Sequence, residues 1–255
     1  MDFKKETRML YRWIARIGNL LLRLLWHLLH VIINLCHFTL GIANALESHL
    51  ISWGILGRYK SLHVAKLRYL AIVVESEEAY QISNIIELLQ WLAAVGIKYV
   101  CLYDREGILK KSKDFILEKL DGAILFKEAH ENNVLLDQTH MTLEFASFSD
   151  GKETMAKAAN VLFKKYLKSG ATDKIQEEQI FTESQMAEAL KTVGSGGPEP
   201  DLLLIYGPAR CHLGFPAWRL RYTEIVHMGS LKSMKYGLLI KAIYRFTTVR
   251  QNYGS

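Results

Sequence analysis

The sequence predicts an α/β protein with a largely parallel sheet flanked by helices, preceded by an N-terminal membrane-associated helix. Short apolar, β-branched runs recur after residue 60, and segments with helical spacing separate them, which is the order of a parallel sheet. Residues 24–46 carry no Asp, Glu, Lys or Arg and are long enough to cross a bilayer. We therefore expect a membrane-associated helical segment at 1–60 and an α/β domain at 61–255.

The strands and helices of the α/β domain follow from their periodicity and end signals. Buried strands are predicted at Tyr69–Val74, Lys98–Tyr103, Met141–Phe148 and Asp201–Tyr206, with Arg219–Val226 as a further candidate. Helices are predicted at Glu77–Val95, Ile108–Leu120, Lys152–Leu167, Thr182–Val193 and Leu231–Phe246. Gly96 is the expected C-cap of the first helix and Thr182 the expected N-cap of the fourth. Residues 168–180 are interpreted as a surface linker and residues 194–200 as a flexible loop.

Polar residues in the N-terminal segment follow one another in steps of three or four, at an average of one helical period. They are Arg8, Arg12, Arg16, Asn19, Arg23, His27, His30, Asn34, His37, Gly41 and Asn44. Three structures fit this pattern: a spanning helix whose stripe faces a partner helix, an interfacial helix lying flat, and a soluble helix packed on the domain. Basic residues flank the apolar stretch on both sides, so the charge rule leaves the topology open.

Composition and motifs exclude several kinds of function. A net charge of +6 over 255 residues is too weak to indicate nucleic acid, and we expect no nucleic-acid partner. The three cysteines, Cys36, Cys101 and Cys211, lie far apart and are expected to be reduced, buried thiols. The histidines of the stripe have no acidic or cysteine ligand nearby, so no metal site is expected. The chain lacks a P-loop, a GxGxxG loop after a strand and the HExxH, GxSxG and SxxK motifs.

Charged residues follow the first two predicted strands, where a parallel sheet binds ligands. The run Glu75-Ser76-Glu77-Glu78 would repel an anionic substrate, and we interpret it as a solvated start of a helix. Residues 104–106 are interpreted as an exposed turn.

The most distinctive stretch is 207–224, GPARCHLGFPAWRLRYTE, with two prolines, two glycines, three arginines and the aromatic residues Phe215, Trp218 and Tyr222. It is either a rigid recognition surface or an ordered loop that fills the end of the sheet. Arg219 and Arg221, two apart on an extended segment, would share one face.

The order of these features resembles the cis-prenyltransferase family, above all its non-catalytic branch of Nogo-B receptor type accessory subunits of dehydrodolichyl diphosphate synthase, and plant members in particular. Catalytic relatives have DLLIR, TGGE, an Arg/Ser pair, F-x-x-W and Y-S-E where this chain has residues 201–226. The matching residues are Asp201, Leu202, Leu203, Gly207, Phe215, Trp218, Tyr222 and Glu224. Ile205, Cys211 and Leu213 replace the family's diphosphate-binding arginines and serine.

The loop after the first strand departs from the catalytic pattern as well. Catalytic members have Asp-Gly-Asn-Arg/Gly-Arg there, for the allylic diphosphate and Mg²⁺, whereas this chain has 75–79, ESEEA. A site that must neutralise two diphosphates cannot lose most of its cations and keep its rate. We therefore expect no working active site in this chain and no catalytic residue.

The resemblance implies a role for the C-terminal tail. Accessory subunits end in Arg-x-Gly, which reaches into the partner's site and helps hold isopentenyl diphosphate. Gly254 matches that glycine and Asn252 stands at the arginine position, while Arg250 is a nearby cation. A glycine can offer a backbone N–H to phosphate without obstruction by a side chain.

The resemblance further implies a non-catalytic subunit that binds, anchors and activates a catalytic cis-prenyltransferase at the endoplasmic reticulum membrane, with a cytosolic domain. The complex would make long cis-polyprenyl diphosphates, such as the dolichol precursor, with Mg²⁺ held mainly by the catalytic partner. The expected interface residues are Phe215, Trp218, Arg219, Arg221 and Tyr222. Alternatives are a self-sufficient prenyltransferase, a membrane receptor or scaffold without an enzymatic partner, and the same accessory role in rubber-type synthesis.

Overall fold

The protein is described by a computed structural model that covers residues 3–60, 62–120, 122–126, 140–168, 181–194 and 197–249. The chain divides into two compact units, Met1–Ile55 and Leu56–Ser255, and each is described by itself. Residues 169–180 of the predicted linker at 168–180, and the predicted tail after Val249, lie outside the described residues. The functional division at residue 60 stays a prediction.

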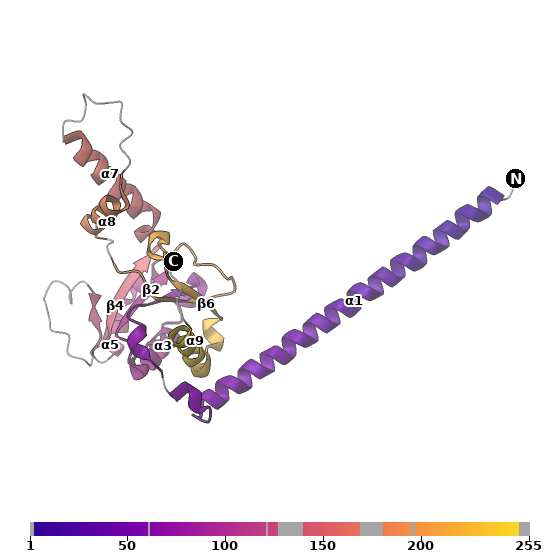
Figure 1. Cartoon of the computed structure of the whole chain (residues 1–255), viewed down its shortest axis with the longest axis horizontal. Coiled ribbons are helices and arrows are strands. Elements are labelled where there is room, and N and C mark those ends of the chain that lie inside the picture. The colour runs from indigo at the N-terminus through magenta and orange to yellow at the C-terminus, as the bar shows by residue number, and fades with distance from the viewer. Residues whose placement is uncertain are drawn as a thin grey trace. The chain divides into compact units, whose positions relative to one another are not determined.

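The first unit is one continuous helix, α1, at Phe3–Ser52 (Figure 1). Its 50 residues correspond to about 75 Å. Among the described residues, Trp13–Ser52 is the one stretch long and apolar enough to cross a membrane. The most apolar 18 residues within it are not buried by the rest of the described chain. The predicted helix over residues 8–44 is therefore confirmed, and no break divides it.

The second unit contains a six-stranded, fully parallel sheet in the order β3-β4-β2-β1-β5-β6, which confirms the predicted fold class. The strands are β1 at Leu70–Val74, β2 at Tyr99–Asp104, β3 at Ile124–Leu125, β4 at Thr142–Ser147, β5 at Leu202–Tyr206 and β6 at Glu224–Gly229. Leu70 in the central strand pairs with Val100 on one side and Leu202 on the other. Apolar side chains cover both faces of β1, so all five of its residues are buried.

Most helices of this unit begin and end close to the predicted positions, but the helix predicted at Leu231–Phe246 begins only at Tyr236, because Leu231–Ser233 forms a separate 3₁₀ turn. The helices are α2 at Ser76–Ala79, α3 at Ile82–Val95, α4 at Ile108–Lys111, α5 at Lys113–Lys119, α7 at Lys152–Lys168, α8 at Glu183–Thr192 and α9 at Tyr236–Thr248. Gly96 caps α3 with φ +91°, and the Thr182 side chain caps α8, as predicted. Two predicted helices are each split in two, because the backbone turns at Tyr80 and at Ser112.

The prediction of a strand at Arg219–Val226 is wrong at its first residues. Ala217–Arg219 forms a 3₁₀ turn, and the strand begins only at Glu224. The physical reason is tertiary, because the Arg219 side chain is held by Glu144 and by the carbonyl of Pro198.

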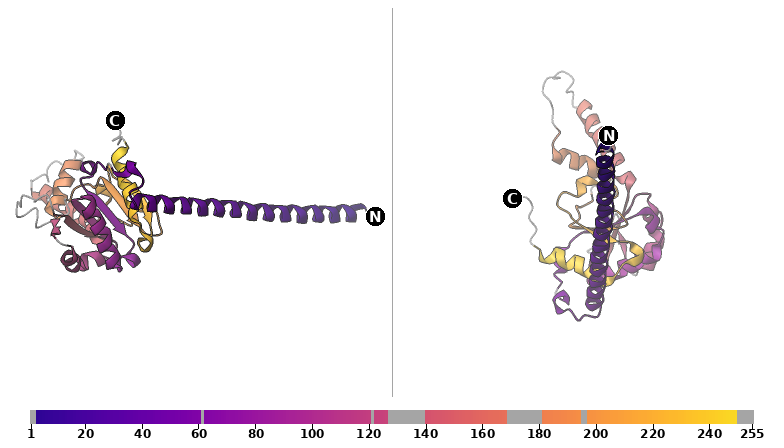
Figure 2. Two further views of the ribbon diagram at one scale, coloured as in Figure 1. Left: turned by 90° about the horizontal axis from the view of Figure 1, so that it is seen from below. Right: turned by 90° about the vertical axis from the view of Figure 1, so that its right-hand side faces the viewer.

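Alternate residues of β1 supply two different cores on the two faces of the sheet. Leu70, Ile72 and Val74 belong to the larger core, which α3 and α9 cover. Ala71 and Val73 belong to a smaller core whose cover includes the loop residue Phe215. Figure 2 shows the strands side by side with the yellow helix α9 beside them. A third small core joins α7 to α8, which project from the sheet in Figure 1.

Candidate functional site

The two segments that the sequence marked as altered ligand loops meet at the carboxyl edge of the sheet. Glu75 follows β1 and donates its backbone N–H to the carbonyl of Tyr206 at the end of β5, at 2.9 Å. A Cβ at Gly207 would lie 3.0 Å from the Cβ of Glu75, so the two loops are in contact and Gly207 leaves the space for it. Open α/β sheets bind ligands at such an edge.

The acidic side chains of this edge make internal hydrogen bonds. The Glu78 carboxylate accepts from the Ser230 hydroxyl at 2.5 Å and from the Leu231 backbone N–H at 2.6 Å. It therefore holds the turn that follows β6. The prediction of a solvated helix start is wrong for Glu78, since its negative charge is used inside the fold.

The prediction of an exposed turn at 104–106 is confirmed for Arg105 and Glu106 and wrong for Asp104, which ends β2. Its side chain is fully buried, and its two oxygens accept the backbone N–H groups of Ile108 and Leu109 at 2.8 and 2.9 Å. A buried carboxylate that caps the start of α4 is a structural group.

The loop after β5 fills the space beside the ends of β2 and β4. Phe215 is 1% exposed, and its ring lies edge-on to Tyr103 with 5.4 Å between centroids. The Tyr103 hydroxyl donates to the carbonyl of Leu213 at 3.0 Å, and burial raises the pKa of Tyr103 to about 12. Gly214 has φ +86°, and a Cβ there would lie 3.1 Å from the Phe148 ring. This part of the loop therefore fills the end of the sheet.

Arg219 is the centre of a buried charged cluster on the same face of the sheet. It is 3% exposed and binds both oxygens of the Glu144 carboxylate, at 2.9 and 2.7 Å. It also donates to the carbonyl of Pro198 at 2.9 Å. The Tyr69 hydroxyl donates a hydrogen bond to the Glu144 carboxylate. Burial raises the pKa of Tyr69 well above its ordinary value, and the neighbouring Cys101 and Glu144 raise it further.

The sequence analysis missed Glu144, although the sequence carried a signal for it. Glu144 is the only charged residue in the strand at Thr142–Ser147, whose other residues are apolar or small. A carboxylate inside such a strand needs a buried cation, and Arg219 supplies it. Gly197 belongs to this cluster too, because a Cβ there would lie 2.7 Å from the Arg219 guanidinium.

Some of the predicted interface residues are buried in the chain's own core, and others are exposed. Phe215 and Arg219 contact the chain's own core, and Trp218 packs on the small core between α7 and α8. Arg221 pairs with Glu183 and keeps half of its side chain exposed, and Tyr222 is 48% exposed. Arg221 and Tyr222 are therefore the members of this set that reach the surface, and the interface role of all five stays a prediction.

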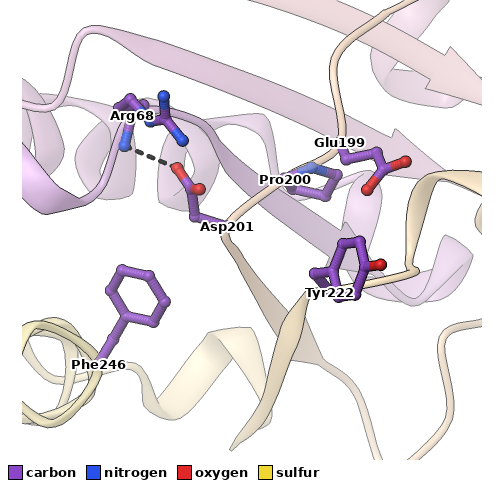
Figure 3. Close-up of a pocket in the computed structure, with 6 residues that line it drawn as sticks. All are labelled: Arg68, Glu199, Pro200, Asp201, Tyr222 and Phe246. Carbon is purple, nitrogen blue, oxygen red and sulfur yellow. Dashed lines mark hydrogen bonds between the residues drawn. The ribbon is translucent and has the colours of Figure 1, made fainter. Parts of the chain in front are cut away.

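The amino edge of the sheet holds a shallow pocket next to the end of α9 (Figure 3). Its lining residues are Arg68, Glu199, Pro200, Asp201, Tyr222 and Phe246. The Asp201 carboxylate accepts the backbone N–H groups of Arg68 and Tyr69 at 2.8 and 2.9 Å. Asp201, one of the residues that match the family, thus joins the start of β5 to the start of β1.

Arg250, Asn252 and Gly254 lie outside the described residues. The last described residue, Val249, follows α9 at this amino edge, where Lys66 donates to the carbonyl of Thr247 at 2.8 Å. The tail therefore starts at the edge of the sheet opposite Glu75 and Gly207.

The described residues do not fit a Mg²⁺ site. Among them, no group of three or more His, Cys, Asp or Glu side chains could hold a metal ion. Glu78 and Asp104, two of the carboxylates at the carboxyl edge of the sheet, already accept backbone N–H groups. Mg²⁺ needs carboxylates that are free to coordinate it.

This parallel sheet, with its altered loops at the carboxyl edge, has the cis-prenyltransferase fold. The solved structure of lavandulyl diphosphate synthase from Lavandula x intermedia, in complex with dimethylallyl diphosphate, matches it with a TM-score of 0.51 and 15% identity. The match covers 74% of this chain and 98% of that chain, and it shows the fold alone. No protein-family model matches the sequence.

Sequence comparison then finds relatives that are similar over most of the chain. The dehydrodolichyl diphosphate synthase complex subunit NUS1 of Homo sapiens is 27% identical over 228 residues, which are 84% of this chain and 74% of that protein. The corresponding nus1 subunit of Schizosaccharomyces pombe is 24% identical over 83% of this chain and 86% of its own length. Over most of its length the chain is therefore similar to subunits of the dehydrodolichyl diphosphate synthase complex, which confirms the resemblance seen in the sequence.

Proposed function

We propose that this chain is the non-catalytic subunit of a membrane-bound cis-prenyltransferase complex at the endoplasmic reticulum. It binds, anchors and activates a catalytic cis-prenyltransferase, which makes a long-chain cis-polyprenyl diphosphate, the dolichol precursor, from isopentenyl diphosphate and a farnesyl-type primer. The homologous subunits named above carry the name of such a complex, which supports the proposal.

The carboxyl edge of the sheet is the observation that carries the proposal. The family's diphosphate-binding positions are occupied in this chain by the stretch Glu75–Ala79 and by Ile205, Cys211 and Leu213. Ile205 and Leu213 belong to the apolar core of that face, and the adjoining Phe215 is buried there. Two diphosphates cannot be stabilised by apolar side chains and carboxylates, so the chain has a structural role in the complex and its partner does the chemistry.

The position of the tail supports action in the partner's site. The tail starts from Val249 at the amino edge, whereas the chain's own altered ligand loops lie at the carboxyl edge. Gly254, with Asn252 and Arg250 nearby, is therefore assigned to isopentenyl diphosphate bound by the catalytic subunit. In this assignment the catalytic subunit holds Mg²⁺, and the globular unit lies on the cytosolic side of the membrane.

Reconstitution tests this function. The full chain, a cognate catalytic cis-prenyltransferase and the pair are assayed for incorporation of labelled isopentenyl diphosphate with a farnesyl primer and Mg²⁺. We expect activity in the pair and none in this chain alone. Gly254→Val should lower the activity of the pair about tenfold or more, because the added side chain would keep isopentenyl diphosphate away from the backbone N–H of residue 254. Ser255→Val, one residue further on, is the matched control.

The outcomes separate the rival functions. Turnover by this chain alone that Glu75→Ala abolishes would establish a self-sufficient enzyme. A cognate catalytic subunit whose activity does not respond to this chain would indicate a membrane receptor or scaffold. Products of rubber length would keep the accessory role and change only the product, because the catalytic partner determines chain length.

A further inference from the structure

Helix α1 carries polar residues at coiled-coil spacing within its apolar stretch. His27, His30, Asn34, His37, Gly41 and Asn44 form this set, which we call the polar stripe. Successive members are three, four, three, four and three residues apart, which is the alternation of the a and d positions of a heptad. All six are exposed on α1. The stripe therefore has the spacing of a helix–helix seam.

The length of the polar stripe matches the core of a bilayer. From His27 to Asn44 the helix rises about 26 Å, against a hydrocarbon core of about 30 Å. The rest of the circumference is apolar, including Leu28, Ile32 and Leu35, which are at least half exposed. A helix lying flat at the surface would lift a large part of this apolar belt out of the lipid, so the distribution favours a spanning helix.

A spanning helix cannot leave these polar groups facing lipid at no cost. One ring nitrogen of His30 lies 3.0 Å from the carbonyl of Trp26, which satisfies it locally. For Asn34 and His37, the described part of the chain offers no hydrogen-bond partner. The described residues also contain no second helix long enough to cross a membrane. The partner of the stripe therefore comes from another chain.

We propose that this partner is α1 of a second copy of the same chain, in parallel and in register, so that two stripes face one another inside the bilayer. Asparagine amides and neutral imidazoles each donate and accept, so the stripe is complementary to itself. Residues 24–46 carry no charge that would repel an identical helix. A Cβ at Gly41 would meet nothing within 4 Å, so a second helix can approach closely there. This inference rests on the proposed membrane association.

Disulfide trapping in membranes tests the pairing. The full chain is expressed with its catalytic partner, with the exposed Cys36 and Cys211 changed to alanine and the buried Cys101 kept. Asn44→Cys places a thiol on the stripe, and Leu46→Cys, exposed on a different face, is the matched control. After copper-phenanthroline oxidation we expect covalent homodimers from Asn44→Cys and not from Leu46→Cys.

Variants in the Asn44→Cys background then test the stripe itself. Asn34→Leu with His37→Leu should lower the dimer yield about tenfold, the change expected from losing interhelical hydrogen bonds. Ile32→Ala, on the opposite face, should leave the yield unchanged. Equal yields from the two reporters, a cross-link to a different polypeptide, or reaction of Asn44→Cys with a membrane-impermeant maleimide without dimers would each overturn the pairing.

Alkaline carbonate extraction distinguishes a failure of the helix pairing from a failure of the proposed function. Release of the chain by carbonate would overturn the membrane anchoring and the pairing with it. Retention in the membrane without cross-links would overturn the pairing alone, and the reconstitution assay would still report on the accessory role.

Discussion

At the scale of single residues, carboxylates of the α/β unit are used to build the fold. Glu78, Asp104 and Asp201 each accept two hydrogen bonds, and at least one donor in each case is a backbone N–H. Glu144 accepts from Arg219. A carboxylate that satisfies backbone donors or a buried cation is fixed in place. These four carboxylates, at both edges of the sheet and within β4, are therefore engaged inside the fold and are not free to coordinate a metal ion.

The Arg219–Glu144 pair gives a prediction at this scale. Arg219→Ala removes both hydrogen bonds to a largely buried carboxylate and the bonds to the Pro198 carbonyl. We expect a loss of about 3–5 kcal/mol in the free energy of unfolding, because a buried charge is left without its partner. Denaturant unfolding of the full chain in detergent measures this loss.

Arg221→Ala is the matched control for this change. Arg221 pairs with Glu183, but both side chains are half or more exposed, so we expect a loss of no more than about 1 kcal/mol. Equal losses for Arg219→Ala and Arg221→Ala would contradict the structural role of the buried pair.

At the scale of elements, the junction between β4 and α7 depends on one carboxylate. Asp150 accepts from the backbone N–H of Ser147 at 2.8 Å and from the Lys110 ammonium at 2.9 Å. Burial raises the pKa of Asp150, but the hydrogen bonds from Lys110 and Ser147 outweigh it and hold the pKa below its ordinary value. The junction is therefore more stable with Asp150 ionised.

Asp150→Asn tests this junction through pH. A lowered pKa in the folded state contributes stability above the unfolded pKa, and this contribution is lost as the pH falls below about 4. We expect Asp150→Asn to lower the free energy of unfolding by about 1 kcal/mol at pH 7. At pH 3 the free energy of unfolding of the variant should approach that of the unmodified chain. Unfolding curves between pH 3 and 7 measure the difference. Asp114→Asn, at an exposed position, should show little pH-dependent difference, and a cost for Asp150→Asn that persists at pH 3 would refute the role of the charge.

At the scale of the whole molecule, the α/β unit has an open sheet edge at β6 where a partner subunit can bind. In the described sheet β6 pairs with β5 alone, and Ile225 on it is 50% exposed. Tyr222, just before β6, is 48% exposed. An apolar and an aromatic side chain on one accessible edge are typical of an interface.

Changing this edge should weaken the complex without unfolding the chain. We expect Tyr222→Ala with Ile225→Ala to lower the affinity for the catalytic subunit at least about tenfold. Copurification and light scattering of the complex measure it, with unfolding curves to check the fold. Tyr80→Ala, at another exposed tyrosine, is the control. Unchanged copurification of the double variant would exclude this edge as the interface.

The sequence by itself determined the parallel sheet, the long N-terminal helix, the caps at Gly96 and Thr182 and the resemblance to subunits of the dehydrodolichyl diphosphate synthase complex. These follow from local periodicity, end signals and missing cations, which need no knowledge of distant contacts. Only the tertiary structure decided that Glu78 and Asp104 are internal caps and that Leu213–Phe215 fills the edge. It also decided that Arg219 lies in a turn against Glu144, 75 residues away in the chain. Such pairings depend on which strands become neighbours, and the burial of a charge is decided by the partner that the fold brings to it.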